Sequence, residues 1–226
     1  MSFDYAPPPP LEETILFEDE HILAVNKPSG LLSVPGRGDH LSDCAEARAK
    51  AHDRNARTVH RLDMDTSGIL LFGKGAEAHR RLSLLFAERK VEKRYIAWVA
   101  GLMPEDDGDI DLPLAVDWPN RPLQKVDMEK GKPSLTCWRV LERREDATLL
   151  ALTPKTGRTH QLRLHCAAIG HAILGDRFYS DPTVRKRASR LQLHAETLEF
   201  HHPMTEEWIS LQAPSNLSGP LLAKNQ

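Results

Sequence analysis

An arginine and an aspartate lie two positions apart in a polar turn that leads into an apolar segment. The turn reads His-Arg-Leu-Asp over residues 60–63, and it continues through Gly68 into the apolar run 69–72. Catalytic groups are often carried by loops that a rigid strand holds in place. A carboxylate beside a fixed positive charge stays ionised and can act as a nucleophile or base. Asp63 is therefore the candidate catalytic residue.

A second polar cluster occupies residues 155–165. Lys155 and Arg158 flank Gly157 just before a predicted helix, whose N-terminus would attract phosphate through its free N–H groups and its dipole. His160 and Arg163 are three positions apart and share a helix face, so that Arg163 could hold a carboxylate in bidentate geometry. The alternative is a surface helix with ordinary ion pairs.

Tyr95 follows Lys93 and Arg94 and opens an apolar strand. A tyrosine at a strand end beside bases could stack on a nucleobase. It could equally be a half-buried core aromatic, which is the commoner position for this residue type.

The histidines and cysteines do not predict a metal site. His160, His165 and His171 are spaced so that they do not share one helical face, and no HExxH motif or cysteine pair is present. The three scattered cysteines indicate free thiols in a reducing compartment, so we expect a cytoplasmic protein.

Composition is that of an ordinary globular protein, with 226 residues, 40% hydrophobic and 27% charged residues. No apolar run approaches the roughly 20 residues of a membrane span, and the acidic N-terminus does not resemble a secretory signal. The formal net charge is −2, but residues 74–94 carry seven bases against three acids. A basic surface on a near-neutral protein is therefore possible, although solvated helix faces would explain the same pattern.

Apolar periodicity predicts many strands and few helices. We expect strands at 15–17 and 22–25 (a hairpin), 69–72, 95–100, 135–141 and 148–153 (a second hairpin), 191–193 and 208–211. We expect helices at 42–51 with Ser42 as N-cap, at 75–90 with Ala78, Leu82, Leu85 and Phe86 on one face, and from Thr159 as N-cap to Gly170 as left-handed C-cap. This order predicts an α+β fold, a single catalytic domain with a mixed, largely antiparallel sheet flanked by helices.

The domain is expected to span residues 14–215. A Pro-rich acidic tail, residues 1–13, precedes it, and a polar tail, residues 216–226, follows it.

Six motifs in order resemble the RluA branch of the pseudouridine synthase superfamily. They are Asn26-Lys-Pro-Ser-Gly-Leu31 with Val34-Pro-Gly36, His60-Arg-Leu-Asp63 with Thr66-Ser-Gly68, Lys93-Arg-Tyr95, Gly157-Arg-Thr-His-Gln-Leu-Arg163, Gly170-His171 with Leu174-Gly-Asp176, and Leu193-His-Ala195 with His202-Pro203. The segments 117–122 and 124–126 look most like members of that branch that modify both a large-subunit rRNA and a tRNA anticodon stem-loop. A departure is Ala172, where a proline commonly follows Gly-His.

The resemblance implies an enzyme that isomerises uridine to pseudouridine in structured RNA, with the active-site cleft across the sheet. It implies that Asp63 is the catalytic aspartate, Arg163 the basic residue paired with it, and Tyr95 the aromatic residue packing on the target base. Arg61 resembles the arginine that fills the space left by the flipped nucleotide. His60, Arg158 and His160 are further expected to bind substrate.

The same resemblance implies a bacterial protein that needs neither metal nor organic cofactor, and whose partner is RNA. It also implies that the N-terminal S4-type RNA-binding domain of many members is absent here. Nothing in the sequence demands more than a monomer.

Two other functions fit part of the sequence. A glycoside or nucleoside hydrolase could use Asp63 with Asp65 as its acid/base pair, but this leaves the Arg-rich cluster unexplained. A non-catalytic RNA-binding module could use the basic residues of segment 74–94.

Overall fold

The computed structural model describes residues 5–9 and 15–218. The chain divides into two compact units, the first made of residues 1–93 and 195–215 and the second of residues 94–194 and 216–226. Strands β5 (Glu92–Ala100) and β11 (Leu193–His201) each contribute residues to both units. Every strand pairing whose register is described is antiparallel.

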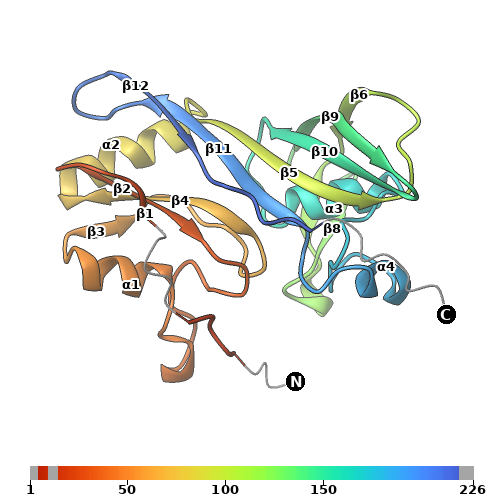
Figure 1. The fold of residues 1–226 in the computed structure, drawn as a ribbon, viewed down its shortest axis with the longest axis horizontal. Coiled ribbons are helices and arrows are strands. Elements are labelled where there is room, and N and C mark those ends of the chain that lie inside the picture. The colour runs from red at the N-terminus through yellow and green to blue at the C-terminus, as the bar shows by residue number, and fades with distance from the viewer. Residues whose placement is uncertain (1–4, 10–14, 219–226) are drawn as a thin grey trace. The chain divides into compact units, whose positions relative to one another are not determined.

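The first unit is a sheet with two α-helices (Figure 1). Its strands follow the order β1-β2-β4-β11, while β3 pairs with β4 and β12 pairs with β11. The elements are β1 (Ile15–Glu18), β2 (Ile22–Lys27), a 3-10 turn (η1, Asp39–Leu41), α1 (Ala45–His52), β3 (Ala56–Thr58), β4 (Ser67–Lys74), α2 (Gly75–Ala87) and β12 (Trp208–Gln212).

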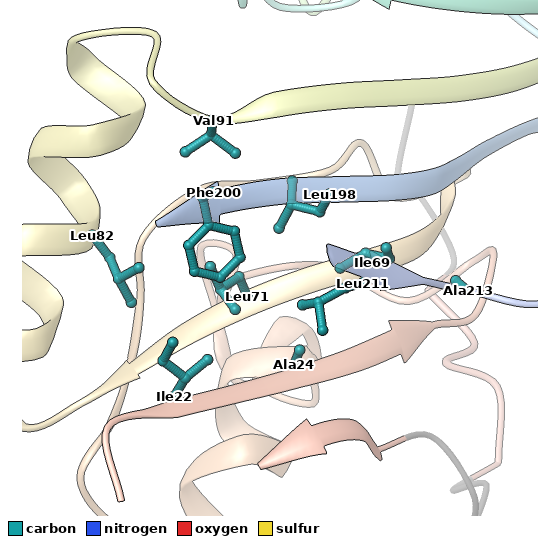
Figure 2. Close-up of a cluster of buried hydrophobic side chains, with 10 residues drawn as sticks. All are labelled: Ile22, Ala24, Ile69, Leu71, Leu82, Val91, Leu198, Phe200, Leu211 and Ala213. Carbon is teal, nitrogen blue, oxygen red and sulfur yellow. The ribbon is translucent and has the colours of Figure 1, made fainter. Parts of the chain in front are cut away.

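The core of the first unit lies between the sheet and α2. Figure 2 shows Leu82 of α2 and Phe200 of β11 pointing into the same cluster as Ile22 and Leu71 from β2 and β4. All four side chains are fully buried. Burial of such side chains is the main favourable term in folding, at about 25 cal/mol per Å² of apolar surface. The strand β4 that follows Asp63 is therefore a rigid element.

The second unit contains a four-stranded run of sheet in the order β5-β10-β9-β6 and a separate two-stranded hairpin of β7 and β8. The remaining elements are β6 (Asp107–Asp111), β7 (Leu114–Val116), a 3-10 turn (η2, Trp118–Asn120), β8 (Gln124–Val126), β9 (Leu135–Arg144), β10 (Ala147–Pro154), α3 (Gln161–Ala168) and α4 (Pro182–Lys186). Its core includes Leu162 and Cys166 of α3, packed with apolar residues of β5 and β10. Burial raises the pKa of the Cys166 thiol to about 12.

Most of the predicted elements are confirmed. Both hairpins form, as β1 with β2 and β9 with β10, and the strands predicted at 69–72, 95–100 and 208–211 are β4, β5 and β12. The helix predicted at 75–90 is α2, which ends at Ala87 because Arg89 takes a left-handed conformation with φ 59°. Gly170, with φ 85°, follows α3 as predicted.

Both predicted helix N-caps are wrong. The chain first makes a 3-10 turn, and Ser42, which ends that turn, has helical torsions. Helix α1 therefore starts after Cys44, which has an extended backbone. The Cys44 Sγ caps the helix by accepting from the Ala47 N–H at 3.4 Å. An N-cap residue must itself be non-helical, which Ser42 is not. Helix α3 starts after His160 rather than Thr159, with His160 in a left-handed conformation and no side-chain cap.

The strand predicted at 191–193 is also misplaced. Strand β11 begins at Leu193 and continues to His201. The polar residues within it pair with β12, where Glu199 lies opposite Ser210, so the apolar pattern alone did not show its length.

Parts of both predicted tails contact the fold. Tyr5 donates from its hydroxyl to the Asp43 carbonyl at 2.8 Å, and Arg48 donates to the Pro8 carbonyl at 2.7 Å. In the second unit, Leu217 packs against a buried cluster that includes Trp98. Residues 1–4, 10–14 and 219–226, which include the predicted domain start at Thr14, lie outside the described residues.

Candidate active site

The polar turn with Asp63 lies between β3 and β4, and its backbone is fastened to the segment after β2. The Leu62 carbonyl accepts a 2.7 Å hydrogen bond from the Ser33 hydroxyl, and the Leu62 N–H donates back to that oxygen at 3.1 Å. The Ser29 hydroxyl donates to the Asp65 carbonyl at 2.7 Å. Because residues on both sides of Asp63 are held, the backbone that carries this carboxylate is fixed.

A buried ammonium group strengthens the same attachment. Lys27 is only 1% exposed, and its Nζ donates to the carbonyls of Pro28, Leu31 and Met64 at 2.9, 2.8 and 3.0 Å. The Gly30 N–H donates to the same Met64 carbonyl at 2.9 Å. A buried charge is tolerated when its donors are satisfied, and here three acceptors surround it. Lys27 thereby ties the turn next to Asp63 to the end of β2.

His60 is turned toward the interior of its own unit. Its ring stacks on Phe86 of α2, with centroids 4.5 Å apart and an interplanar angle of 17°, and its Nε2 accepts from the Leu71 N–H of β4 at 3.0 Å. Burial, with the charge of Lys93 nearby, lowers the pKa of His60 from 6.5 to about 3. The imidazole is therefore neutral at pH 7, with the proton on Nδ1. His60 therefore has a structural role, in packing its turn against α2 and β4, in addition to any contact with substrate.

The other charged residues of the turn differ in exposure. Arg61 is exposed, and within the described residues its side chain makes no hydrogen bond or ion pair. Asp63 and Asp65 are half-buried. An exposed arginine beside a fixed aspartate is available to a large substrate.

Arg163 in the second unit forms a buried bidentate ion pair with Asp176. Its Nε and Nη2 donate to the two carboxylate oxygens at 2.8 and 2.7 Å, and the side chains are 2% and 0% exposed. This geometry fixes the plane of the guanidinium. A surface helix with ordinary ion pairs is therefore wrong for this position.

The carboxylate of Asp176 has a second task. Its Oδ1 also accepts from the N–H groups of Phe178 and Tyr179 at 2.8 and 3.2 Å, which forms a tight turn after Gly175. The rings of Phe178 and Tyr179 lie 4.9 and 5.5 Å from the Arg163 guanidinium carbon. Aromatic faces stabilise such a cation, so the turn holds Arg163 from several sides.

The other predicted residues of the second unit lie just before α3. The His160 Nδ1 lies 2.7 Å from the Tyr179 hydroxyl. The Arg158 N–H donates to the Gln161 Oε1 at 3.0 Å, and the Arg158 Nε donates to the Pro133 carbonyl at 3.4 Å. The second unit thus brings Arg158, His160 and Arg163 together around the start of α3.

Tyr95 lies near the start of β5, opposite Leu152 of β10. It is half-buried and packs against the core of the second unit. This position is compatible with both alternatives for its role, because the side chain packs on the core without being fully buried.

No metal centre is found among the described residues, where no three histidine, cysteine or acidic side chains are placed to share an ion. His165 instead has a structural role. Its Nδ1 is hydrogen-bonded to the Thr136 hydroxyl and its Nε2 to the Leu112 carbonyl, both at 3.0 Å. Burial lowers the pKa of His165. Within the described residues, no helix has the length and apolarity to cross a membrane.

Comparison with known proteins identifies the class. A family model described as RNA pseudouridylate synthase matches residues 21–168, a range that contains both Asp63 and Arg163. The chain belongs to this family, and its fold is that of a single pseudouridine synthase domain built from two compact units. The protein is accordingly an RNA pseudouridine synthase, an isomerase, which removes the hydrolase and the non-catalytic module from consideration.

Curated relatives match over nearly their full length. A dual-specificity RNA pseudouridine synthase RluA of Pasteurella multocida is 49% identical over 211 residues, covering 93% of this chain and 96% of the relative. One of Escherichia coli K12 is 47% identical over 214 residues, covering 94% and 98%. Among solved structures, human RNA pseudouridylate synthase domain containing 1 matches with a TM-score of 0.77 at 29% identity, covering 93% of this chain and 86% of that one.

Lys27 and Asp176 were assigned no role from the sequence, although both hold the candidate catalytic residues in the structure. Lys27 and Asp176 both occur in motifs that carry the family resemblance, but their tasks depend on partners 37 and 13 positions away. A lysine at the end of an otherwise buried strand was the available signal for Lys27. No comparable local signal distinguishes Asp176.

Proposed function

We propose that Asp63 is the catalytic aspartate of this pseudouridine synthase and that Arg163 is the basic residue that keeps its carboxylate ionised. The observation that carries this assignment is the turn of residues 60–66, whose backbone is fixed on both sides of Asp63 by Lys27, Ser29 and Ser33. Fixed placement of a nucleophile supplies a large part of a catalytic rate by avoiding the entropy cost of positioning it.

The reaction exchanges one bond for another within a single nucleotide. The bond from ribose C1′ to uracil N1 breaks, the base rotates, and a bond from C1′ to C5 forms. The proton of C5 is lost to solvent and N1 gains a proton, so no oxidant or activated donor is consumed. Asp63 acts on the nucleotide as nucleophile or base, and both roles need the carboxylate ionised.

Arg61 and Tyr95 are proposed to receive the target nucleotide. The exposed guanidinium of Arg61 fills the space that the flipped base leaves, and Tyr95 packs on the base itself. Flipping costs a few kcal/mol and least for a base already in a loop, so stem-loops are the expected substrates. Arg158 and His160 are proposed to contact the RNA near α3, and His60 is proposed to position the turn.

We further propose that the substrates are a large-subunit rRNA hairpin and a tRNA anticodon stem-loop. The dual-specificity names of the bacterial relatives, at 49% and 47% identity, support two RNA substrates. The enzyme is proposed to act as a cytoplasmic monomer without a cofactor, with residues 14–215 as its catalytic domain.

Tritium release from RNA labelled at uridine C5 tests the assignment of Asp63. Wild type should release tritium from both stem-loops without free uracil. Asp63→Asn should abolish release while RNA affinity stays within a few-fold, because the amide keeps the shape of the side chain but is not a nucleophile.

Asp65→Asn is the matched control, since Asp65 lies in the same turn and is equally half-buried. It should retain most of the activity. Release by Asp63→Asn at a rate near that of wild type, or an equal loss in both variants, would contradict the assignment. Release from one RNA alone would restrict the substrate proposal and leave Asp63 in place.

A further inference from the structure

The β7–β8 hairpin presents an exposed tryptophan. Trp118 is 67% exposed, the largest fraction among the described tryptophans. It lies in the η2 turn between the two strands, and Figure 1 shows the hairpin, with the β8 label, next to α3. A tryptophan side chain carries a large apolar surface with one polar N–H group, and tryptophans are therefore enriched at interfaces.

The turn that carries Trp118 is ordered by its own hydrogen bonds. The Asn120 and Leu123 N–H groups donate to the carbonyls of Asp117 and Asn120, both at 3.0 Å, and the Asp117 N–H donates to the Leu123 carbonyl at 3.0 Å. The Asn120 side-chain amide donates to the Asp117 carboxylate at 2.9 Å. Because the backbone of the turn is already ordered, little more than the Trp118 side chain has to lose conformational freedom when a partner binds.

A cation lies on the same turn. The Arg121 guanidinium carbon is 4.4 Å from the Trp118 ring centroid, and its Nε donates to the Trp118 carbonyl at 3.3 Å. Arg121 is exposed, and in the described part of the chain it has no acidic partner. An aromatic ring with an adjacent unneutralised guanidinium offers stacking to a base and hydrogen bonds to a phosphate.

The charges around this pair favour an anionic partner. The hairpin and the turn after it carry Arg121, Lys125, Lys130 and Lys132 against Asp117, Asp127 and Glu129. This is an excess of one positive charge. Asp127 accepts from the N–H groups of Lys130 and Glu129 and pairs with Lys125 at 3.2 Å, contacts that lower its pKa, so this acid and this base neutralise each other.

The hairpin is also fastened to the residues around Arg163. The Gln124 N–H of β8 donates to the Tyr179 hydroxyl at 2.9 Å, and that hydroxyl lies 2.7 Å from the His160 Nδ1. The Tyr179 ring is itself 5.5 Å from the Arg163 guanidinium carbon. One tyrosine thus links the hairpin to the group of residues that the proposed function places at the RNA.

We propose that Trp118 and Arg121 form an RNA contact, in which an unpaired base of the stem-loop stacks on Trp118 and a neighbouring phosphate binds Arg121. This contact rests on the proposed function only in requiring a structured RNA as substrate. It acts in binding and takes no part in the bond exchange at uridine.

Binding and turnover of an anticodon stem-loop by Trp118→Ala test the proposal. The dissociation constant and KM should rise roughly tenfold, within the range that stacking of one base gives, while kcat stays within twofold. Arg121→Gln should reduce the slope of log affinity against log salt by roughly 0.7, the value for one phosphate contact to a single strand.

Trp208→Ala is the matched control, because Trp208 is 50% exposed on β12 of the first unit and has its own neighbour in His201. It should leave affinity and KM unchanged. A thermal melt of each variant should match wild type, since both rings are exposed.

Three results would overturn the proposal: an affinity of Trp118→Ala within twofold of wild type, an equal loss in Trp208→Ala, or a change in oligomeric state without loss of RNA binding. The last would make the hairpin a contact between copies of this chain. Binding measured with the Asp63→Asn protein gives the same answer whether or not Asp63 is catalytic, so the two proposals fail separately.

Discussion

Two buried charges hold the candidate catalytic groups, one in each unit. Lys27 binds three carbonyl groups around the turn of Asp63, and Asp176 binds the guanidinium of Arg163. Removing one partner from such a group costs more than the interaction contributes, because the remaining polar atoms stay buried without compensation. Residues that do not touch the substrate are therefore expected to control activity.

Lys27→Met should destabilise the first unit and misplace Asp63. The thioether side chain has similar length but removes the donor of the Pro28 and Leu31 carbonyls, while the Met64 carbonyl keeps the Gly30 N–H. The free energy of unfolding should therefore fall by about 3 kcal/mol. Denaturant unfolding measures this loss, and kcat of the folded fraction should fall more than KM rises.

Lys50→Met is the control for that substitution, since Lys50 is exposed and only pairs with Glu46 one helical turn away. Its cost should stay within about 0.5 kcal/mol. If Lys27→Met were as mild as Lys50→Met, the proposed role of the buried ammonium group would be wrong.

At the scale of elements, α3 is joined to the turn after Gly175 by the ion pair of Arg163 and Asp176. Asp176→Asn should keep the turn, because the amide oxygen still accepts from Phe178 and Tyr179, but it removes the charge that orients Arg163. We expect a loss of about 3 kcal/mol in stability, as for a broken buried ion pair, and a fall in kcat.

Asp181→Asn is the matched control for this change. Asp181 also accepts from two backbone N–H groups, those of Thr183 and Val184, but it is exposed and has no described ion pair. Its turnover should equal that of wild type. Normal kcat in Asp176→Asn, measured on folded protein, would show that Arg163 is oriented by other contacts.

The helices and strands also show which features of the fold can be predicted from the sequence alone. Apolar periodicity located β4, β5 and α2 because each buries one continuous set of side chains in its own unit. The helix starts were missed because a cap depends on backbone torsions that the side-chain type does not reveal. Ser42 has helical torsions, and α3 begins after the left-handed His160. Asp63 and Arg163 were predicted from their motifs, and their catalytic roles stay predictions. Lys27 and Asp176 act through tertiary contacts, and of the two only Lys27, at the end of an apolar strand, has a local signal.

For the whole molecule, stability should depend on pH through His60. Its pKa is about 3 in the folded protein and near 6.5 when unfolded, so only the unfolded chain binds this proton between those values. The stabilisation is complete above pH 6.5 and falls by about 1.4 kcal/mol per pH unit as the pH drops toward 3.

His60→Gln tests this linkage. The amide can still accept from Leu71 N–H but does not titrate, so the variant should lose less stability than wild type between pH 6.5 and 5.5, by about 1 kcal/mol. Urea unfolding at both pH values measures the difference. Identical pH dependence in the two proteins would show that His60 becomes protonated without cost and is not held neutral.

The positions of the cysteines give each unit its own reporter of opening. Cys44, at the start of α1, and Cys166, in α3, are both fully buried, and they belong to different units. Only a thiolate on an accessible side chain reacts with an alkylating reagent, so each of these thiols is protected until its unit opens. The rate at which each thiol is alkylated in the native protein therefore records the separate opening of one half of the enzyme, with no introduced label.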